Sequence, residues 1–377
     1  MIKVLIVLVA IVFIAQLVRI FELSSLITKT KNEVSDRSNH VNGVLLLISG
    51  IGLLIFFFWQ RAAWMDLTLK VPASEHGPII DNLWDTTMGL IIVVFLILTP
   101  ILFGVAFWFR GKLANKASYI THNNKLEFFW TAIPAVVLLV LISYGLSVWG
   151  KIVNQDISNA MVIEIYAKQF NWTARYSGDD NRLGRADVRF VQGKNELGVI
   201  AKNTKEIQIM NIENKIEILK EQQTNNNNPA ENKIISKRIK KLEHKKKTMM
   251  TYFVTTELDK LLAAEDDIVT KELHLPVGKQ VLFKFRSQDV IHSAYLPHFR
   301  VQMNCVPGTT TQFAFTPTIT TTDMKKELGD ENFEYVLLCN KICGTAHYNM
   351  QMKVIVETEE EYNEWLLQQE KNKIGNL

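Results

Sequence analysis

The residues best suited to chemistry stand in one short stretch near the end of the chain, "CNKICGTAHYNM". This stretch contains Cys339, Cys343, His347 and Met350. Thiolate, imidazole and thioether groups are soft ligands, and together they suit copper. A disulfide between the two cysteines is the alternative, but it would leave the histidine and the methionine without a purpose. The remaining cysteine, Cys305, lies in "NCVPG" and is predicted to be a small buried apolar group.

The ligand stretch lies between segments that read as β-strands, because apolar and polar residues alternate and β-branched and aromatic residues are frequent. Segments with this pattern are 161–167, 186–192, 279–287, 311–317, 333–339 and 351–358. They predict an all-β, cupredoxin-like sandwich whose edge presents the ligand loop. A further histidine ligand must then come from elsewhere, and the strand-like stretch around His292 and His298 supplies two candidates. Thr358 is predicted to cap a final amphipathic helix.

Residues 203–265 interrupt the strand pattern with helical periodicity. The low-complexity turn "TNNNNP" divides this segment, so it predicts a helical hairpin inserted into the β domain. Residues 233–247 hold eight Lys or Arg against one Glu, a composition that also occurs in nucleic-acid-binding segments. A solvated helix face is the preferred interpretation, and no nucleic acid is expected as a partner.

The first 150 residues contain four apolar runs. Residues 88–109 and 128–149 carry no charge over 22 positions each, which gives about 33 Å of helix, enough to cross a bilayer. Residues 44–59 predict a third span, with Trp59 suited to the membrane interface. Residues 4–18 are either a retained span or a signal peptide, and the retained helix is preferred because no clear cleavage site follows.

The loop charges predict the orientation of these spans. Residues 19–43 and 110–127 carry four Lys or Arg each, and residues 60–87 carry two. The richer loops belong inside, which places everything after Trp149 outside. The predicted domains are 1–43 with the first span and inner loop, 44–150 with the spans including the 88–149 hairpin, and 151–377 with the sandwich and its 203–265 insertion.

At this point the chain resembles a known family, subunit II of the haem–copper cytochrome c oxidases. The pattern Cys-x3-Cys-x3-His-x2-Met is similar to the family's binuclear copper (CuA) loop. The stretch Asp-Val-x-His-Ser around His292, followed by Pro307-Gly308, resembles its partner stretch. Residues 122–139 look like the start of the second helix of the family's membrane hairpin. The resemblance covers about residues 80–202 and 270–358.

The resemblance implies a set of copper ligands. Cys339 and Cys343 would bridge two copper ions, and His292 and His347 would bind one ion each. Met350 and the backbone carbonyl of Lys341 would be the weak ligands. Two bridging thiolates let one unpaired electron spread over both ions, which keeps the geometry nearly constant between oxidation states. His298 is expected to remain outside this set.

Three positions in the resemblance concern function beyond the ligands. Lys341 stands where the family usually has Glu, so a Mg²⁺ site at the subunit interface is in doubt, because Mg²⁺ prefers oxygen ligands. Phe170 takes the place of the aromatic residue credited with receiving electrons, with Trp172 two residues later. Glu127, just before a span, either caps the helix N-terminus or stands at the mouth of a proton-uptake channel.

The function implied is that of subunit II of an aa3-type oxidase in a bacterial inner membrane, with the copper domain on the outer, periplasmic face. It would accept electrons from cytochrome c and pass them to haem in subunit I, which also holds CuB; subunit III and the lipid bilayer are further partners. No Cys-x-x-Cys-His motif occurs, so no haem is expected in this chain. A membrane-tethered copper chaperone is the alternative.

Overall fold

The structure is a computed structural model. The residues that it describes are 13–14, 16–20, 35–68, 71–116, 118–254 and 263–376. The chain divides into two compact units, one made of residues 1–68 and 84–143, the other of residues 69–83 and 144–377. Most of the predicted span at 4–18 lies outside the described residues.

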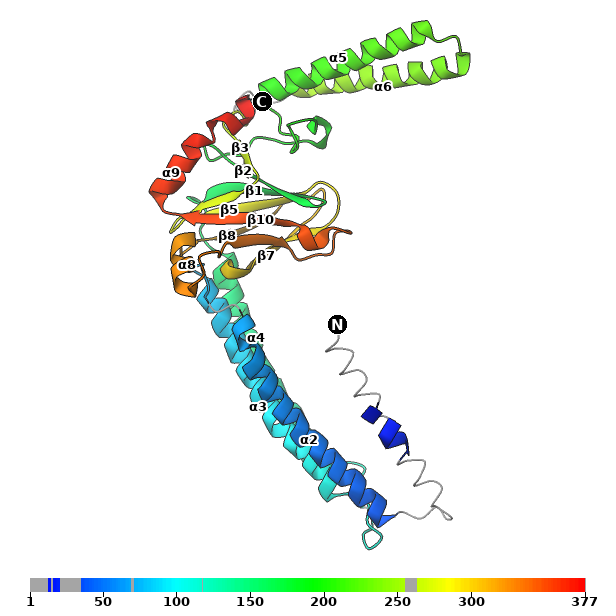
Figure 1. The fold of residues 1–377 in the computed structure, drawn as a ribbon, viewed down its shortest axis with the longest axis vertical. Helices are drawn as coiled ribbons and strands as arrows, with labels where there is room; N and C mark the ends of the chain where they lie inside the picture. Colours follow the sequence, from blue (N-terminus) through cyan, green and yellow to red (C-terminus); the bar gives the residue numbers. More distant parts are fainter. Residues whose placement is uncertain are drawn as a thin grey trace. The chain divides into compact units, whose positions relative to one another are not determined.

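Three long apolar helices supply the membrane-spanning part of the chain (Figure 1). They are α2 (Asp36–Trp64), α3 (Gly77–Trp108) and α4 (Asn124–Val153), with the short 3₁₀ helix η1 (Met65–Leu67) after the first. The shortest has 29 residues, about 44 Å of helix, which exceeds the thickness of a bilayer core. The spans predicted at 44–59, 88–109 and 128–149 fall on these helices, which confirms three of the four predicted spans.

The β domain is a sandwich of two five-stranded sheets. One has the order β3-β2-β1-β5-β8 and the other β4-β10-β9-β6-β7. The strands are β1 (Met161–Lys168), β2 (Asn171–Tyr176), β3 (Ile268–Thr270), β4 (Leu273–Pro276), β5 (Val281–Ser287), β6 (His292–Leu296), β7 (Val301–Cys305), β8 (Thr311–Phe315), β9 (Tyr335–Cys339) and β10 (Gln351–Glu357). Buried aromatic side chains fill the space between the sheets, among them Phe283, Phe285 and Phe315. The predicted cupredoxin-like sandwich is confirmed.

The strand predicted at 186–192 is wrong. This stretch forms isolated bridges at Ala186 and Gln192 and the short 3₁₀ helix η2 (Val188–Phe190). The Asp187 carboxylate accepts a hydrogen bond from the Arg189 backbone N–H at 2.9 Å, and this local turn competes with strand pairing. The short strands β2, β3 and β4 were not predicted.

Short helices complete the β domain. Helix α9 (Glu359–Gln368) begins after Thr358, whose side chain forms a capping box with Glu361, as the sequence predicts. Helix α8 (Thr321–Leu328) was not predicted. The remaining 3₁₀ helices are η3 (Pro297–Phe299), η4 (His347–Asn349), η5 (Glu370–Asn372) and η6 (Ile374–Asn376).

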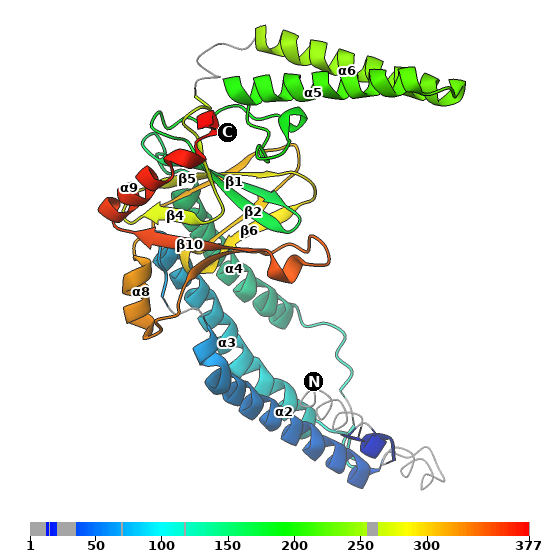
Figure 2. The same ribbon diagram turned by 45° about the horizontal axis from the view of Figure 1, so that its top comes forward.

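The predicted insertion is a helical hairpin of α5 (Lys202–Asn225) and α6 (Pro229–Val254), which lie side by side in both views (Figures 1 and 2). Ile212 and Ile216 of α5 pack with Ile239 and Met249 of α6 in one buried seam. At its base, the Asn203 amide donates to the Ile374 carbonyl at 2.7 Å. The hairpin is therefore anchored to the last residues of the chain.

Candidate metal centre

Two cysteine sulfurs form the middle of the candidate site. Cys339 is the last residue of β9, and Cys343 follows in the loop toward β10. Their Sγ atoms lie 3.9 Å apart, and both cysteines are free. A disulfide would require a distance of about 2.05 Å, so the disulfide alternative is not what the structure contains. Burial, followed by the neighbouring Cys339, raises the pKa of Cys343 to about 11, which keeps this thiol protonated at neutral pH in the metal-free chain.

One imidazole faces each sulfur. Strand β6 pairs with β9 so that Ala294 lies opposite Cys339, and this register brings His292, at the start of β6, to the end of β9. The Nδ1 atom of His292 lies 3.7 Å from Cys339 Sγ. His347, on η4, has its Nδ1 atom 3.6 Å from Cys343 Sγ. A residue 47 positions upstream thus lies beside the loop, where the family resemblance places it.

Each sulfur also has one weaker donor beside it. The Lys341 carbonyl accepts a hydrogen bond from Cys339 Sγ at 3.2 Å. The Met350 Sδ atom lies 3.7 Å from Cys343 Sγ, and this side chain is buried. The candidate donors therefore fall into two sets around the pair of sulfurs, the His292 imidazole with the Lys341 carbonyl beside Cys339 and the His347 imidazole with the Met350 thioether beside Cys343.

This division fits two soft metal ions better than one. Among the described residues, the ligand atoms of His292, Cys339 and Cys343 lie within 4.8 Å of one another, and His347 is outside that set. One ion held by those three residues would leave His347 and Met350 unused. Thiolate and imidazole donors suit copper, whereas Mg²⁺ and Ca²⁺ require oxygen ligands.

Asp289 orients the upstream imidazole. Its Oδ1 atom lies 2.9 Å from His292 Nε2, which leaves Nδ1 to face the sulfur. The other carboxylate oxygen accepts a hydrogen bond from the Gln169 backbone N–H at 2.7 Å. Burial alone would raise the pKa of Asp289, but hydrogen bonds from Gln169 and His292 lower it. Asp289 therefore remains ionised and can hold the imidazole in one orientation.

We expect Asp289→Ala to leave the candidate metal ligands in place but to weaken copper binding about 10- to 100-fold, because the His292 ring loses its orienting partner. Competition with a copper chelator measures this change. The exposed residue Glu331 offers a matched control, and Glu331→Ala should leave the affinity unchanged. Equal affinities for the two variants would contradict the orienting role of Asp289.

Residues from the start of β2 close the inner side of the loop. Trp172 is 1% exposed, and its Nε1 donates to the Met350 carbonyl at 3.4 Å. Its ring lies 6.1 Å from that of His292, edge to face. The Gln169 amide donates to the Cys343 carbonyl. The sequence analysis did not predict these supporting contacts of Gln169 and Asp289. The position of Asp289 three residues before His292 could have indicated the contact between those two side chains.

Phe170 lies against the ligand loop, as its predicted role requires. Gly344, next to Cys343, has a φ of +144°, and a Cβ at this position would come within 2.8 Å of Phe170 Cζ. Glycine thus allows the aromatic ring to approach the loop backbone. The predicted roles of Phe170 and Trp172 in electron transfer stay predictions.

Glu127 belongs to the other compact unit and caps α4. Its Oε1 accepts from the Asn123 N–H at 3.2 Å, while Asn123 Oδ1 accepts from the Leu126 N–H at 3.1 Å. This reciprocal arrangement satisfies two backbone donors at the helix N-terminus. Capping accounts for the residue locally, and its predicted role in proton uptake stays a prediction.

The fold and the donor set define a membrane-anchored cupredoxin-like protein with a candidate binuclear metal centre. Residues 62–148 match the family described as "Cytochrome C oxidase subunit II, transmembrane domain". Residues 242–358 match "Cytochrome C oxidase subunit II, periplasmic domain". The chain belongs to the cytochrome c oxidase subunit II family.

Individual relatives agree with this assignment. "Alternative cytochrome c oxidase subunit 2" of Bradyrhizobium diazoefficiens is 28% identical over 86% of this chain and 91% of its own length. "Cytochrome c oxidase subunit 2" of Thermostichus vulcanus is 24% identical, over 85% of this chain and 83% of its own. The match to the crystal structure of the periplasmic domain of subunit II (CoxB) of Bradyrhizobium japonicum covers 56% of this chain and 94% of the solved chain, with 16% identity. The TM-score of this match is 0.28.

Proposed function

We propose that this chain is the electron-entry subunit of an aa3-type cytochrome c oxidase, with a binuclear CuA centre. The observation that supports this most is the pair of sulfurs 3.9 Å apart, each with its own imidazole at 3.6 to 3.7 Å. Cys339 and Cys343 would bridge two copper ions, with His292, His347, Met350 and the Lys341 carbonyl as terminal ligands. When bound, the copper pair takes up and gives out single electrons.

The chain's own residues would keep the centre rigid. His292 is fixed by Asp289, the Cys343 carbonyl by Gln169, and the Met350 carbonyl by Trp172. A site held at this many points changes little when its charge changes, and fast electron transfer requires a small reorganisation. Phe170, at the ligand loop, would be the entry point for electrons.

The proposed donor is cytochrome c, and the proposed acceptor is haem in subunit I, where CuB and oxygen reduction would reside; subunit III would complete the assembly. The membrane would be a bacterial inner membrane, with the copper domain on its periplasmic face. The Lys341 side chain is exposed and cannot bind Mg²⁺, so we do not include an interface Mg²⁺ in the proposal.

Copper stoichiometry and the EPR spectrum of the purified full-length chain test this proposal. We expect two copper ions per chain and a hyperfine pattern from one electron shared over two copper nuclei. The alternative, a membrane-tethered copper chaperone, predicts one labile ion and a spectrum localised on one nucleus. A single ion, or none after loading under reducing conditions, would contradict the CuA assignment.

A further inference from the structure

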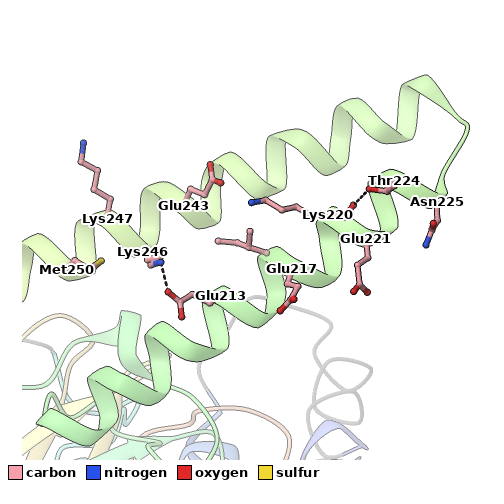
Figure 3. Close-up of a pocket in the computed structure, with 11 residues that line it drawn as sticks. Glu213, Glu217, Lys220, Glu221, Thr224, Asn225, Glu243, Lys246, Lys247 and Met250 are labelled. Atoms are coloured by element: carbon pink, nitrogen blue, oxygen red, sulfur yellow. Dashed lines mark hydrogen bonds and ion pairs between the residues drawn. The ribbon is translucent and has the colours of Figure 1, made fainter.

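The two long sides of the hairpin differ in chemistry. Figure 3 shows one of them, which we call the acidic side (Glu213, Glu217, Glu221 and Glu243). Three of these carboxylates recur every fourth residue of α5, and lysines stand among them, including Lys246, which pairs with Glu213. Opposite charges therefore meet on this side within the hairpin itself.

The other side is a groove of about 730 Å³ with a basic rim. We call it the basic groove (Lys215, Ile218, Arg238, Lys241, Leu242 and Lys245). No carboxylate lines it. Arg189, which also lines it, pairs with Asp187, whereas no ion pair is found for the four rim cations Lys215, Arg238, Lys241 and Lys245 among the residues that the structure describes. Ile218 and Leu242 give the groove an apolar floor, and the cations give it a positive edge. The groove is therefore complementary to a ligand that is acidic and partly apolar.

The groove continues toward the turn of the hairpin. A second hollow of about 770 Å³ shares Ile218, Gln222 and Arg238 with it and adds Ile234. The carboxylates of Glu221 and Glu231 also line this second hollow, so the positive rim is confined to the basic groove and the continuation offers mainly apolar contact. Ile218 is 53% exposed and Ile234 is 55% exposed, although both are large and apolar. From Glu231 to Thr248 the lining of α6 covers about 25 Å of helix axis. A trough of this length between two antiparallel helices fits a third helix.

We propose that the basic groove binds an amphipathic helix of a partner protein, one that carries apolar residues on one face and Asp or Glu along its edges. The helix would pack its apolar face on Ile218, Ile234 and Leu242 and place its carboxylates beside the rim cations. This inference goes beyond the proposed electron-transfer function and involves none of the copper ligands.

Charge argues against a second copy of the hairpin as the occupant, and shape argues against a lipid surface. A second copy of the hairpin, related by a twofold axis, would set the basic groove against itself and bring like charges together. Packing the groove on the acidic side of another copy would be a head-to-tail contact, which builds a ring or an open filament rather than a closed dimer. A flat lipid surface would meet the rim cations but would leave the apolar floor of the groove unfilled.

Fluorescence anisotropy of the full-length chain in detergent tests the proposal. The probe is a labelled amphipathic helical peptide of Glu and Leu, compared with a scrambled peptide of the same composition and with a Lys–Leu helix. We expect only the acidic amphipathic helix to bind, and more weakly as salt rises. Charge reversal of the rim should weaken binding about tenfold or more. The variant is Lys215→Glu, Arg238→Glu, Lys241→Glu and Lys245→Glu together.

Reversal of Lys220 and Lys246 to Glu on the acidic side is the matched control and should change the affinity less than about twofold. An unchanged copper EPR spectrum in both variants reports that they fold, whatever the spectrum shows about the number of ions. Equal binding of the scrambled peptide, or an equal loss in the control variant, would overturn the proposal.

Photo-crosslinking from position 218 in native membranes separates the possible occupants. An adduct with a different polypeptide, lost on reversal of the rim charges, supports a partner helix when the acidic peptide also competes for it. An adduct with a second copy of the chain, or with lipid alone, would overturn the proposal. Binding of the full-length chain to phosphatidylglycerol vesicles that depends on the same rim cations, without peptide binding, would overturn it as well.

Discussion

Cys343→Ser should abolish the proposed binuclear centre. Cys343 Sγ contacts three other proposed ligand atoms: Cys339 Sγ at 3.9 Å, His347 Nδ1 at 3.6 Å and Met350 Sδ at 3.7 Å. A hydroxyl is a harder and poorer donor for copper than a thiolate and cannot bridge two ions in the same way. Electron entry should therefore fall by more than about 100-fold, since the loss of outer hydrogen-bond partners alone weakens metal sites about 10- to 100-fold.

Copper content, EPR and the rate of cytochrome c oxidation by the assembled oxidase measure this effect together. Cys305→Ala is the control, because Cys305 is fully buried in the core and is not among the proposed ligands. It should retain both ions. A Cys343→Ser chain that still holds two copper ions with an unchanged spectrum would refute the bridging role.

The local pattern of candidate ligands could be read from sequence because Cys339, Cys343, His347 and Met350 stand within twelve residues. His292 could be predicted only through the resemblance, since spacing alone did not choose between it and His298. The structure gives the physical reason for the choice: the register of β6 on β9 places His292 beside Cys339. The His298 ring instead packs edge to face with Phe333 and Tyr335, at centroid distances of 5.0 and 5.5 Å.

The rest of the fold was harder to predict, because strands pair with partners that are distant in the sequence. Strand β2 has only six residues and was missed, although it carries Trp172 behind the ligand loop. Its pairing with β1 sets Arg175 opposite Glu164. An alternating sequence pattern would assign these two charged side chains to the solvent-facing side of the sheet. The stretch at 186–192 was predicted as a strand but does not form one, because a local hydrogen bond to the Asp187 side chain outweighed its alternating pattern.

The buried pair of Arg175 and Glu164 leads to the second large prediction. Arg175 Nε lies 2.6 Å from Glu164 Oε2, and its Nη1 lies 3.1 Å from Asp267 Oδ2. Arg286 also pairs with Glu164. Burial alone would raise the pKa of Glu164, but Arg175 and Arg286 lower it; burial raises the pKa of Asp267 to about 7 even though Arg175 opposes the shift.

Arg175→Met should destabilise the domain by about 3 to 5 kcal/mol, because it leaves two buried carboxylates without a central counter-ion. Methionine retains much of the side-chain volume, so the effect reports on charge more than on packing. Thermal unfolding of the full-length chain, followed by near-UV circular dichroism, measures it. Lys326→Met removes an exposed pair with Asp323 and should cost less than about 1 kcal/mol.

The pH dependence of this loss separates charge from packing. Without Arg175, the folded-state pKa of Glu164, which is lowered in the parent chain, should rise above its unfolded value, and that of Asp267, already raised to about 7, should rise further. Such groups contribute stability below the unfolded pKa, and this contribution disappears as the pH rises through the folded pKa. The destabilisation should therefore be small near pH 4 to 5 and grow toward pH 8. Glu164 causes the growth at lower pH, because its pKa is lowered only in the parent chain, and Asp267 adds to it above about pH 7, where it ionises in the parent chain. A loss of equal size at both ends of this range would show that Arg175 stabilises the domain through packing and not through its charge.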